Sequence, residues 1–119
     1  MNKIHPYTYV GIVEIPKTTF SINPIDAFNE MVDLCSKIFG ISENNILGRS
    51  RKRPYVVARQ IIAYILRKKY NLSLSRIGKL MNRDHSTIVH NLECHKNDYE
   101  TNDWYARKAN FIIKQYVKD

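Results

Sequence analysis

The sequence predicts an all-α protein: a compact domain of five to six helices that contains a helix-turn-helix, with an extended or disordered N-terminal arm. Two observations lead to this fold class. Residues that begin or end helices recur along the chain at short intervals. Between them, apolar residues repeat at the three- and four-residue spacing of a helix face. The stretches with this spacing are residues 25–39, 54–69, 74–99 and 104–116. We therefore predict an arm at 1–24 and one helix-turn-helix domain at 25–119.

The arm is the least regular part of the chain. Tyr7 to Ile15 is rich in strand-forming residues, and Pro6, Pro16 and Pro24 interrupt the stretch. An extended arm, a single strand docked on the domain and a disordered segment all fit this pattern. We do not expect a regular sheet, because an isolated strand finds no partner elsewhere in the sequence.

The first predicted helix has clear signals at both ends. Asn23 can cap it, Pro24 suits its first position, and Gly40 ends it. Its apolar face consists of Phe28, Met31, Val32, Cys35, Ile38 and Phe39. A short helix or turn follows at 42–48, capped by Ser42 and closed by Gly48.

The long helix from Pro54 to about Lys69 is predicted to be central. Arg53 precedes a proline, so we expect it to be extended. The predicted inward face is Val57, Ala58, Ile61, Tyr64 and Ile65. The predicted opposite face is Arg59, Ala63, Arg67 and Tyr70.

Two short helices joined by a tight turn are predicted over residues 74–92. Asn82 can take the left-handed conformation that ends the first helix, and Asp84 can cap the second. The predicted buried stripe of the second helix is Ile88, Leu92, His95 and Tyr99. The opposite side carries Ser86, Thr87, His90 and Asn97. This is the pattern of a helix-turn-helix, whose second helix reads bases in the major groove.

The last predicted helix can be capped by Asn102 or Asp103. Its broad apolar face runs from Trp104 to Tyr116 and either closes the core or binds another protein or another copy of the chain. Residues 1–24 are the second candidate surface for such a partner.

Basic residues are concentrated in one interval. The formal net charge is +8, and no acidic residue lies between Glu43 and Asp84. Eleven of the nineteen lysines and arginines are in that interval. Basic residues that served only solubility would be distributed along the whole chain. Their concentration in one interval therefore predicts contacts with nucleic-acid phosphates.

Other classes of function fit less well. His85, His90, Cys94 and His95 are close in sequence, but structural zinc sites pair close ligands with a distant second pair. We expect no metal, no cofactor and no catalysis, since a phosphate-binding Gly-x-x-x-x-Gly-Lys-Ser/Thr loop is missing. With no long apolar run or signal sequence, we expect no membrane partner, reduced thiols at Cys35 and Cys94, and a cytoplasmic, nucleoid-associated protein.

The segment Arg83-Asp84-His85-Ser86-Thr87-Ile88-Val89-His90 resembles the signature Arg-Asp-His-Thr-Thr-Val-Leu-His. That signature belongs to the C-terminal DNA-binding domain of the bacterial replication initiator DnaA. The resemblance extends upstream through Ser73 to Gly78 and through 49–67, and covers roughly residues 25–100. The family usually has two glycines before Arg-Asp-His, where this chain has only Asn82.

The resemblance implies binding to double-stranded DNA, at A·T-rich sites similar to DnaA boxes, in replication initiation or its regulation. It implies that Arg51 enters the minor groove and that Asp84 and Thr87 read bases. The full predicted DNA-binding set is Arg49, Arg51, Lys52, Arg53, Arg59, Gln60, Arg83, Asp84, His85, Ser86, Thr87 and His90. A transcriptional regulator using the same module and an RNA-binding protein are the alternatives. The tyrosines fall mostly on helical stripes or in the arm, which disfavours base stacking on RNA.

Overall fold

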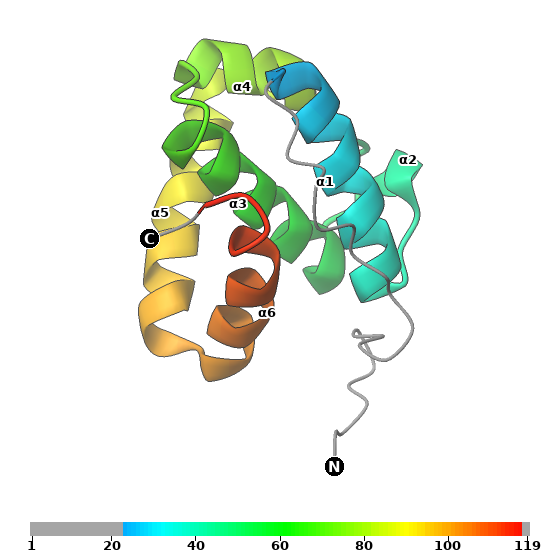
Figure 1. Ribbon diagram of the computed structural model, residues 1–119, viewed down its shortest axis with the longest axis vertical. Coiled ribbons are helices and arrows are strands. Elements are labelled where there is room, and N and C mark those ends of the chain that lie inside the picture. The colour runs from blue at the N-terminus through cyan, green and yellow to red at the C-terminus, as the bar shows by residue number, and fades with distance from the viewer. Residues whose placement is uncertain (1–22, 118–119) are drawn as a thin grey trace. The chain divides into compact units, whose positions relative to one another are not determined.

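The computed structural model describes residues 23–117, which contain six helices and no strand (Figure 1). The prediction of an all-α fold is therefore confirmed for this part of the chain. The helices are α1 (Pro24–Phe39), α2 (Glu43–Ile46), α3 (Arg53–Lys68), α4 (Leu74–Met81), α5 (His85–Thr101) and α6 (Asp103–Ile113). The predictions for the arm fall almost entirely on residues 1–22, outside the described residues.

The chain divides into two compact units, Met1–Ala58 and Arg59–Asp119, so the boundary falls inside α3. The first unit contains α1, α2 and the start of α3. The second contains the rest of α3 together with α4, α5 and α6. The predicted boundary between an arm at 1–24 and a domain at 25–119 stays a prediction.

In the first unit, α1 begins and ends where the sequence predicts. The Asn23 side chain accepts a hydrogen bond from the Ile25 amide at 2.8 Å, and Pro24 occupies the first turn. Gly40 adopts φ 65° at the other end, a left-handed conformation that a residue with Cβ rarely takes. The six residues of the predicted apolar face are all buried. The caps and the apolar stripe therefore confirm the reading of this helix.

The start of α3 differs from the prediction. Arg53 is the first residue of the helix rather than an extended residue before it. The Lys52 carbonyl accepts from the amides of Tyr55 and Val56, both at 3.1 Å, and so opens the helix. Pro54 then stands within the first turn, where amides have no helical partner and a missing N–H costs little.

The predicted outward face of α3 is also wrong in part. Arg59 is 6% exposed and Ala63 is fully buried, whereas Arg67 is exposed and Tyr70 partly so. Ile62 and Leu66, which neither predicted face included, are fully buried as well. Between 57 and 66, burial extends around nearly the whole helix. The apolar stripe of α3 is therefore wider than the stripe of a helix that has one exposed face.

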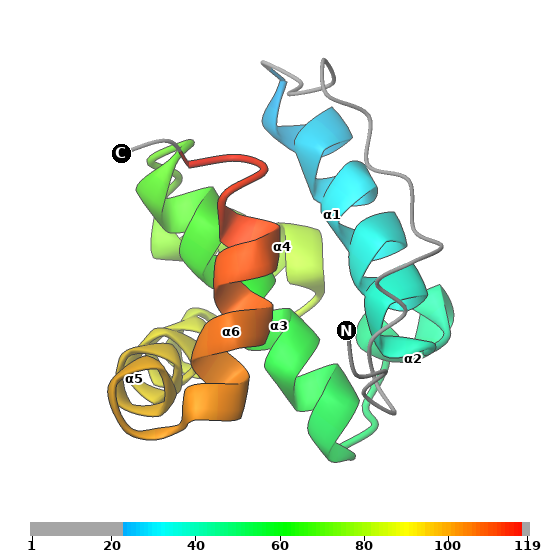
Figure 2. The ribbon, with the colours of Figure 1, turned by 60° about the horizontal axis from the view of Figure 1, so that its bottom comes forward.

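In the second unit, α5 is held by polar contacts to α3 and α6. The Gln60 side chain donates to the Asp98 carboxylate at 3.1 Å, and the Tyr64 ring stacks on His95 with centroids 4.2 Å apart. His95 Nδ1 lies 2.6 Å from the Tyr105 hydroxyl of α6. Figures 1 and 2 both show α5 beside α6. His95 thus joins three helices.

The predicted buried stripe of α5 holds for Ile88 and His95 but not for Tyr99. Tyr99 is 39% exposed, and its hydroxyl donates to Asn110 of α6 at 2.5 Å. Leu92 is half-buried. A tyrosine can rest its ring on a neighbouring helix while its polar end reaches solvent, which periodicity alone does not reveal.

α6 begins at the predicted cap. The Asn102 side chain accepts from the Tyr105 amide at 3.1 Å. Tyr105, Ala109 and Ile112 are fully buried, while Trp104 is half-buried. Most of the apolar face therefore belongs to the core of this unit. A partner bound by the remainder of that face stays a prediction.

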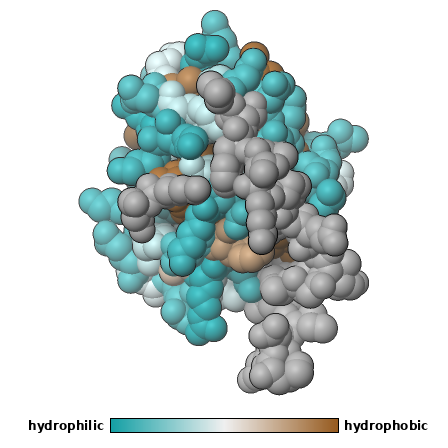
Figure 3. Space-filling view, viewed as in Figure 1, coloured by the Kyte–Doolittle hydropathy of each residue, from teal (hydrophilic) through white to brown (hydrophobic). Residues whose placement is uncertain are grey.

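Hydrophilic residues cover most of the described surface in the face that Figure 3 shows. Among residues 23–117, no helix is long and apolar enough to cross a membrane.

The burial of His95 leads to a pH-dependent stability. Burial lowers the pKa of His95 to about 4, against a smaller raising effect of the Asp98 charge. An unfolded histidine titrates near 6.5, so below that pH the unfolded chain binds more protons than the folded one. The contribution of His95 to the free energy of unfolding is therefore fully present above about pH 6.5, and it is lost as the pH falls toward 4. The difference between 6.5 and about 4 corresponds to about 3.4 kcal/mol, and partial access of solvent reduces this to roughly 1–2 kcal/mol.

Urea denaturation at several pH values measures this decline. In His95→Gln the free energy of unfolding is expected to be lower at pH 7 but flatter between pH 6.5 and 4. His90→Gln, a substitution at an exposed histidine of the same helix, is the control and keeps the original pH dependence. An unchanged slope in His95→Gln would assign the acid sensitivity to other groups.

Candidate nucleic-acid interface

The turn between α4 and α5 is built from backbone hydrogen bonds. Ser73 caps α4 by accepting from the Arg76 amide at 3.1 Å. Asn82 ends the helix with φ 56° and ψ 47°, as predicted, and its amide donates to the carbonyls of Gly78 and Lys79. The Arg83 amide also donates to the Gly78 carbonyl, at 2.7 Å. Only Asn82, Arg83 and Asp84 separate α4 from α5, so the chain turns tightly from one helix into the next.

Gly78 is the residue that permits this turn. A Cβ at this position would lie 2.4 Å from the carbonyl oxygen of Arg83, a distance that real Cβ atoms do not show. Gly78 was not predicted to be a turn residue. The available signal was a glycine inside an otherwise helical pattern, which indicates a close approach of backbone.

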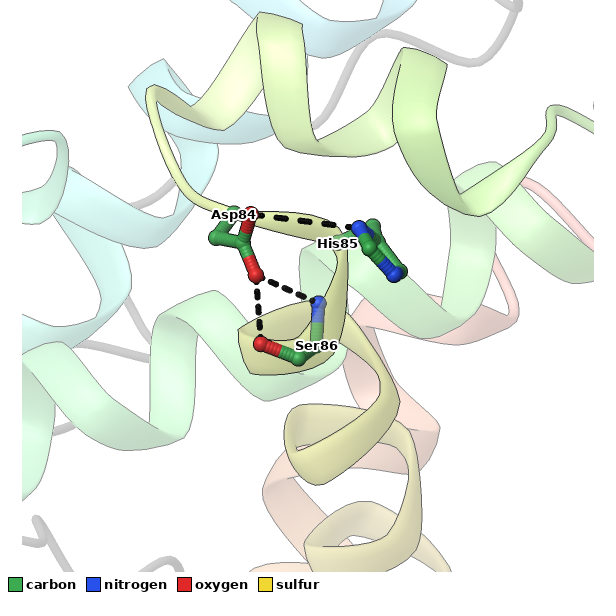
Figure 4. Close-up of polar contacts among 3 residues, drawn as sticks. All are labelled: Asp84, His85 and Ser86. Atoms are coloured by element: carbon green, nitrogen blue, oxygen red, sulfur yellow. Dashed lines mark hydrogen bonds and ion pairs between the residues drawn. The ribbon is translucent and has the colours of Figure 1, made fainter.

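Asp84 caps α5 as predicted. One carboxylate oxygen, Oδ2, accepts from the Ser86 amide at 3.1 Å and from the Ser86 hydroxyl at 2.5 Å (Figure 4). The other oxygen, Oδ1, lies 3.8 Å from Nδ1 of His85. The Ser86 hydroxyl, then its amide, hold the pKa of Asp84 below its ordinary value. Asp84 therefore stays ionised at neutral pH and keeps Oδ1 on the surface as an acceptor.

The first turn of α5 presents a polar surface. His85, Ser86 and His90 are exposed, and Thr87 is half-buried. The amides of Ser86 and Thr87 already donate to Asp84, and the helix dipole favours negative charge at this end. This surface can therefore present short polar side chains to base edges.

Arg83 has a structural role in the turn. One of its guanidinium nitrogens donates to the carbonyls of Met81 and Asn82, at 3.0 Å and 3.4 Å. These bonds hold the guanidinium against the turn, and a contact of Arg83 with nucleic acid stays a prediction.

The cysteine and histidines of α5 do not converge. His90 Nε2 lies 3.4 Å from Cys94 Sγ on the outer side of the helix, whereas His95 points inward to Tyr105. No group of three or more metal-ligating side chains occurs among residues 23–117. Cys35 is buried, and burial raises the pKa of its thiol to about 12.

The basic loop at 49–53 lies in the first unit. Arg49, Arg51, Lys52 and Arg53 are all exposed. The Lys52 amide donates to the Ser50 hydroxyl at 3.3 Å, and the Lys52 carbonyl opens α3. The loop therefore leads into a helix N-terminus with its cationic side chains on the surface, an arrangement suited to phosphate.

Arg59 and Gln60 are placed differently from the other predicted DNA-binding residues. Both are buried, at 6% and 2% exposure, and Gln60 donates to Asp98. Their side chains serve the packing of the second unit. A contact of either residue with DNA stays a prediction, and for Gln60 it would require the bond to Asp98 to break or be shared.

Comparison with known proteins identifies the fold that carries these surfaces. Residues 28–94, more than half of the chain, match the family described as the bacterial dnaA protein helix-turn-helix. The chain belongs to this family. The DnaA match begins within α1 and ends within α5, so it includes both the basic loop and the helix-turn-helix.

Individual DnaA relatives align over similar regions. Chromosomal replication initiator protein DnaA 2 of Chlamydia caviae is 46% identical over 59 residues, which is 50% of this chain and 13% of that protein. DnaA of a Synechococcus species is 34% identical over 100 residues, 76% of this chain and 21% of that protein. DnaA of Ureaplasma parvum is 36% identical over 89 residues, 73% of this chain and 20% of that protein. The chain thus matches about a fifth or less of the length of these relatives. No solved structure matches this chain.

The close approach at Gly78 gives a test of this DnaA-type turn. Alanine normally stabilises a helix relative to glycine by roughly 0.5–1 kcal/mol. In Gly78→Ala the new Cβ meets the Arg83 carbonyl and forces the backbone to move, so we expect a net loss of roughly 1–3 kcal/mol in the free energy of unfolding. Urea denaturation measures it. Ser75→Ala, at an exposed position of the same helix, is the control and should change stability by less than about 0.5 kcal/mol. A stabilised Gly78→Ala protein would show that the turn does not need glycine.

Proposed function

We propose that this chain is a sequence-specific double-stranded-DNA-binding module that acts in replication initiation or its regulation. Membership of the DnaA helix-turn-helix family supports the proposal most directly. The relatives are chromosomal replication initiator proteins, which supports the link to replication. The module needs no cofactor and performs no catalysis. Its work is to bring whatever is attached or bound to it to a particular DNA sequence.

The first turn of α5 is the proposed reading surface. Asp84 keeps Oδ1 available to accept from a cytosine amino group, since its two bonds to Ser86 use Oδ2. Ser86 donates its hydroxyl proton to Asp84, so toward a base it acts as an acceptor. Thr87 offers its methyl group to a thymine methyl, and His85 donates to a base or a phosphate.

The basic loop is proposed to supply affinity rather than sequence preference, except at Arg51. Arg49, Lys52 and Arg53 would contact phosphates and release counterions. Arg51 would enter the minor groove, where a narrow A·T-rich groove attracts an inserted arginine. The exposure of all four side chains is compatible with both kinds of contact.

The general test is selection of bound sequences from a random duplex library, followed by binding measurements on the selected site, random duplex, single strands and structured RNA. We expect the selection to yield a defined sequence. We also expect the chain to bind that duplex more tightly than random duplex, single strands or structured RNA. Equal or tighter binding to structured RNA would reject it in favour of an RNA-binding role.

Thr87→Ala tests the reading surface. Loss of the methyl contact is expected to reduce discrimination at one base position by roughly 1–3 kcal/mol, with little change in binding to random duplex. Thr101→Ala makes the same substitution at the exposed last residue of α5 and should leave both affinities unchanged. An equal loss on the selected site and on random duplex would contradict the assignment of Thr87 to a base.

Arg51→Ala and Lys52→Ala separate the two roles of the basic loop. Lys52→Ala should weaken binding to all sequences alike and reduce the salt dependence of the association constant by about one counterion. Arg51→Ala should weaken binding most at sites with A·T-rich flanks. The two roles are distinguished by measuring the affinity of each variant for sites with A·T-rich and with G·C-rich flanks at several salt concentrations.

The control for both is Lys37→Ala. Lys37 is an exposed lysine of α1 that pairs with Asp33 and lies outside the basic interval, so its loss should not affect binding. If Arg51→Ala shows no dependence on the flank, Arg51 is a further phosphate contact and does not enter the minor groove.

A further inference from the structure

A cleft in the second unit is separate from the residues proposed to read DNA. Its lining comes from the end of α3, the C-terminal half of α5, α6 and the residues that follow it. Its volume is about 650 Å³. Sites for small molecules usually have volumes of roughly 300–1,000 Å³, so the cleft can hold one such molecule.

Aromatic rings form one wall of this cleft. Tyr64 and His95 stack at 4.2 Å with an angle of 24° between their planes, and the ring of Tyr99 lies 5.7 Å from His95. All three residues line the cleft, with Leu92 and Ile113 as aliphatic neighbours. Such a wall favours a flat apolar group, because aromatic groups pack well on stacked or tilted rings.

His95 supplies one polar atom within this wall. Its side chain is buried, and Nδ1 lies against the Tyr105 hydroxyl. Among residues 23–117, the hydrogen bond of this ring is the one made through Nδ1, and Nε2 is the second ring nitrogen. Burial keeps the ring neutral at pH 7, as its lowered pKa shows. When the Tyr105 hydroxyl donates to Nδ1, Nε2 carries the proton and can donate to a ligand.

Cations surround the opening of the cleft. Arg67, Lys68, Lys96 and Lys114 line it and are exposed, and among the lining residues within 23–117 Glu100 is the acidic one. The Arg67 guanidinium is held in place by donating to the Leu72 carbonyl at 2.8 Å. The lining therefore has a net positive charge above an apolar, aromatic wall.

We propose that this cleft binds a small molecule that combines a flat aromatic ring system with a carboxylate or phosphate group. The ring would lie against Tyr64, His95 and Tyr99, and the anionic group would lie among the lysines and Arg67. Neither half of the lining would recognise such a ligand alone: the aromatic wall has little charge, and exposed lysines without that wall would bind any anion weakly.

The proposal does not depend on DNA binding. At a rise of 1.5 Å per residue, His95 lies about 14 Å along α5 from Ser86, so a ligand here does not occupy the first turn of the helix. Binding can therefore be measured on the whole chain without DNA present.

The experiment uses four probes measured by calorimetry and by amide chemical shifts of the intact protein. The two expected ligands are 2-naphthoate and 2-naphthyl phosphate. The neutral 2-naphthamide keeps the ring without the charge, and cyclohexanecarboxylate keeps the charge without the flat ring. We expect saturable binding of at least one naphthyl anion at one site, and at least tenfold weaker binding of both control compounds. Tighter binding of the carboxylate or of the phosphate shows which of these two anionic groups the cleft prefers.

Variants locate the site. The double variant Lys96→Gln with Lys114→Gln changes only exposed residues and should weaken the anion at least tenfold, without changing binding of 2-naphthamide. Lys79→Gln, at an exposed lysine of α4 outside the cleft, is the matched control and should leave binding unchanged. Tyr64→Leu should weaken all naphthyl probes, with circular dichroism to verify that it folds.

Several results would overturn the proposal. These are the absence of saturable binding by either naphthyl anion, equal binding of the neutral or the non-aromatic compound, and full binding by the double lysine variant. If Tyr64→Leu does not fold, the double lysine variant alone decides the location.

Discussion

The contact between Gly78 and the carbonyl of Arg83 is the constraint on which the rest of the candidate interface depends. It lets the chain leave α4 and enter α5 with almost no intervening loop. Asn82 takes the left-handed conformation, the amides of Asn82 and Arg83 share the Gly78 carbonyl, and Asp84 arrives where it can cap α5. A side chain at position 78 would move Arg83, and with it the cap and every residue of the first turn. The geometry proposed to read bases is therefore fixed from the helix before it.

The two ends of α5 differ in their surroundings. Its first turn has exposed polar side chains on one side and the fully buried Ile88 on the other. Its C-terminal half is fixed by Gln60, Tyr64 and Tyr105 through Asp98 and His95. A rigid attachment at one end orients the other, which suits a helix that must present several short side chains to a groove at once. The neutral, buried His95 is central to this attachment because it contacts both α3 and α6.

Local features of this fold could be predicted from the sequence, and features that depend on distant residues could not. Asn23, Gly40, Asn82, Asp84 and Asn102 were assigned correctly because a cap acts on amides or carbonyls within a few residues of itself. The burial of Arg59 and Ala63 was missed because periodicity assigns one apolar stripe to a helix, and α3 is enclosed on nearly all sides.

The residues of the candidate site show the same difference between local features and features that depend on distant residues. The exposed first turn of α5 and the exposed basic loop could be located from residue type and spacing alone. The partner of Gln60 is 38 residues away in sequence, and no local pattern indicates that its side chain is committed to Asp98. Gly78 was overlooked for a related reason: its importance comes from a carbonyl oxygen in the next segment, which becomes visible only when both segments are placed.

The separation of the two halves of α5 also bears on how such a protein evolves. Ser86 and Thr87 lie outside the buried attachment around His95, so substitutions there leave the main supports of the fold in place. If these two residues read DNA as proposed, the target sequence can change through substitutions that leave stability nearly unchanged. Changes at His95, Tyr64 or Tyr105 have no such freedom, because each must be compensated by its neighbours. Diversity should consequently accumulate at one end of the helix, and the other end should change slowly.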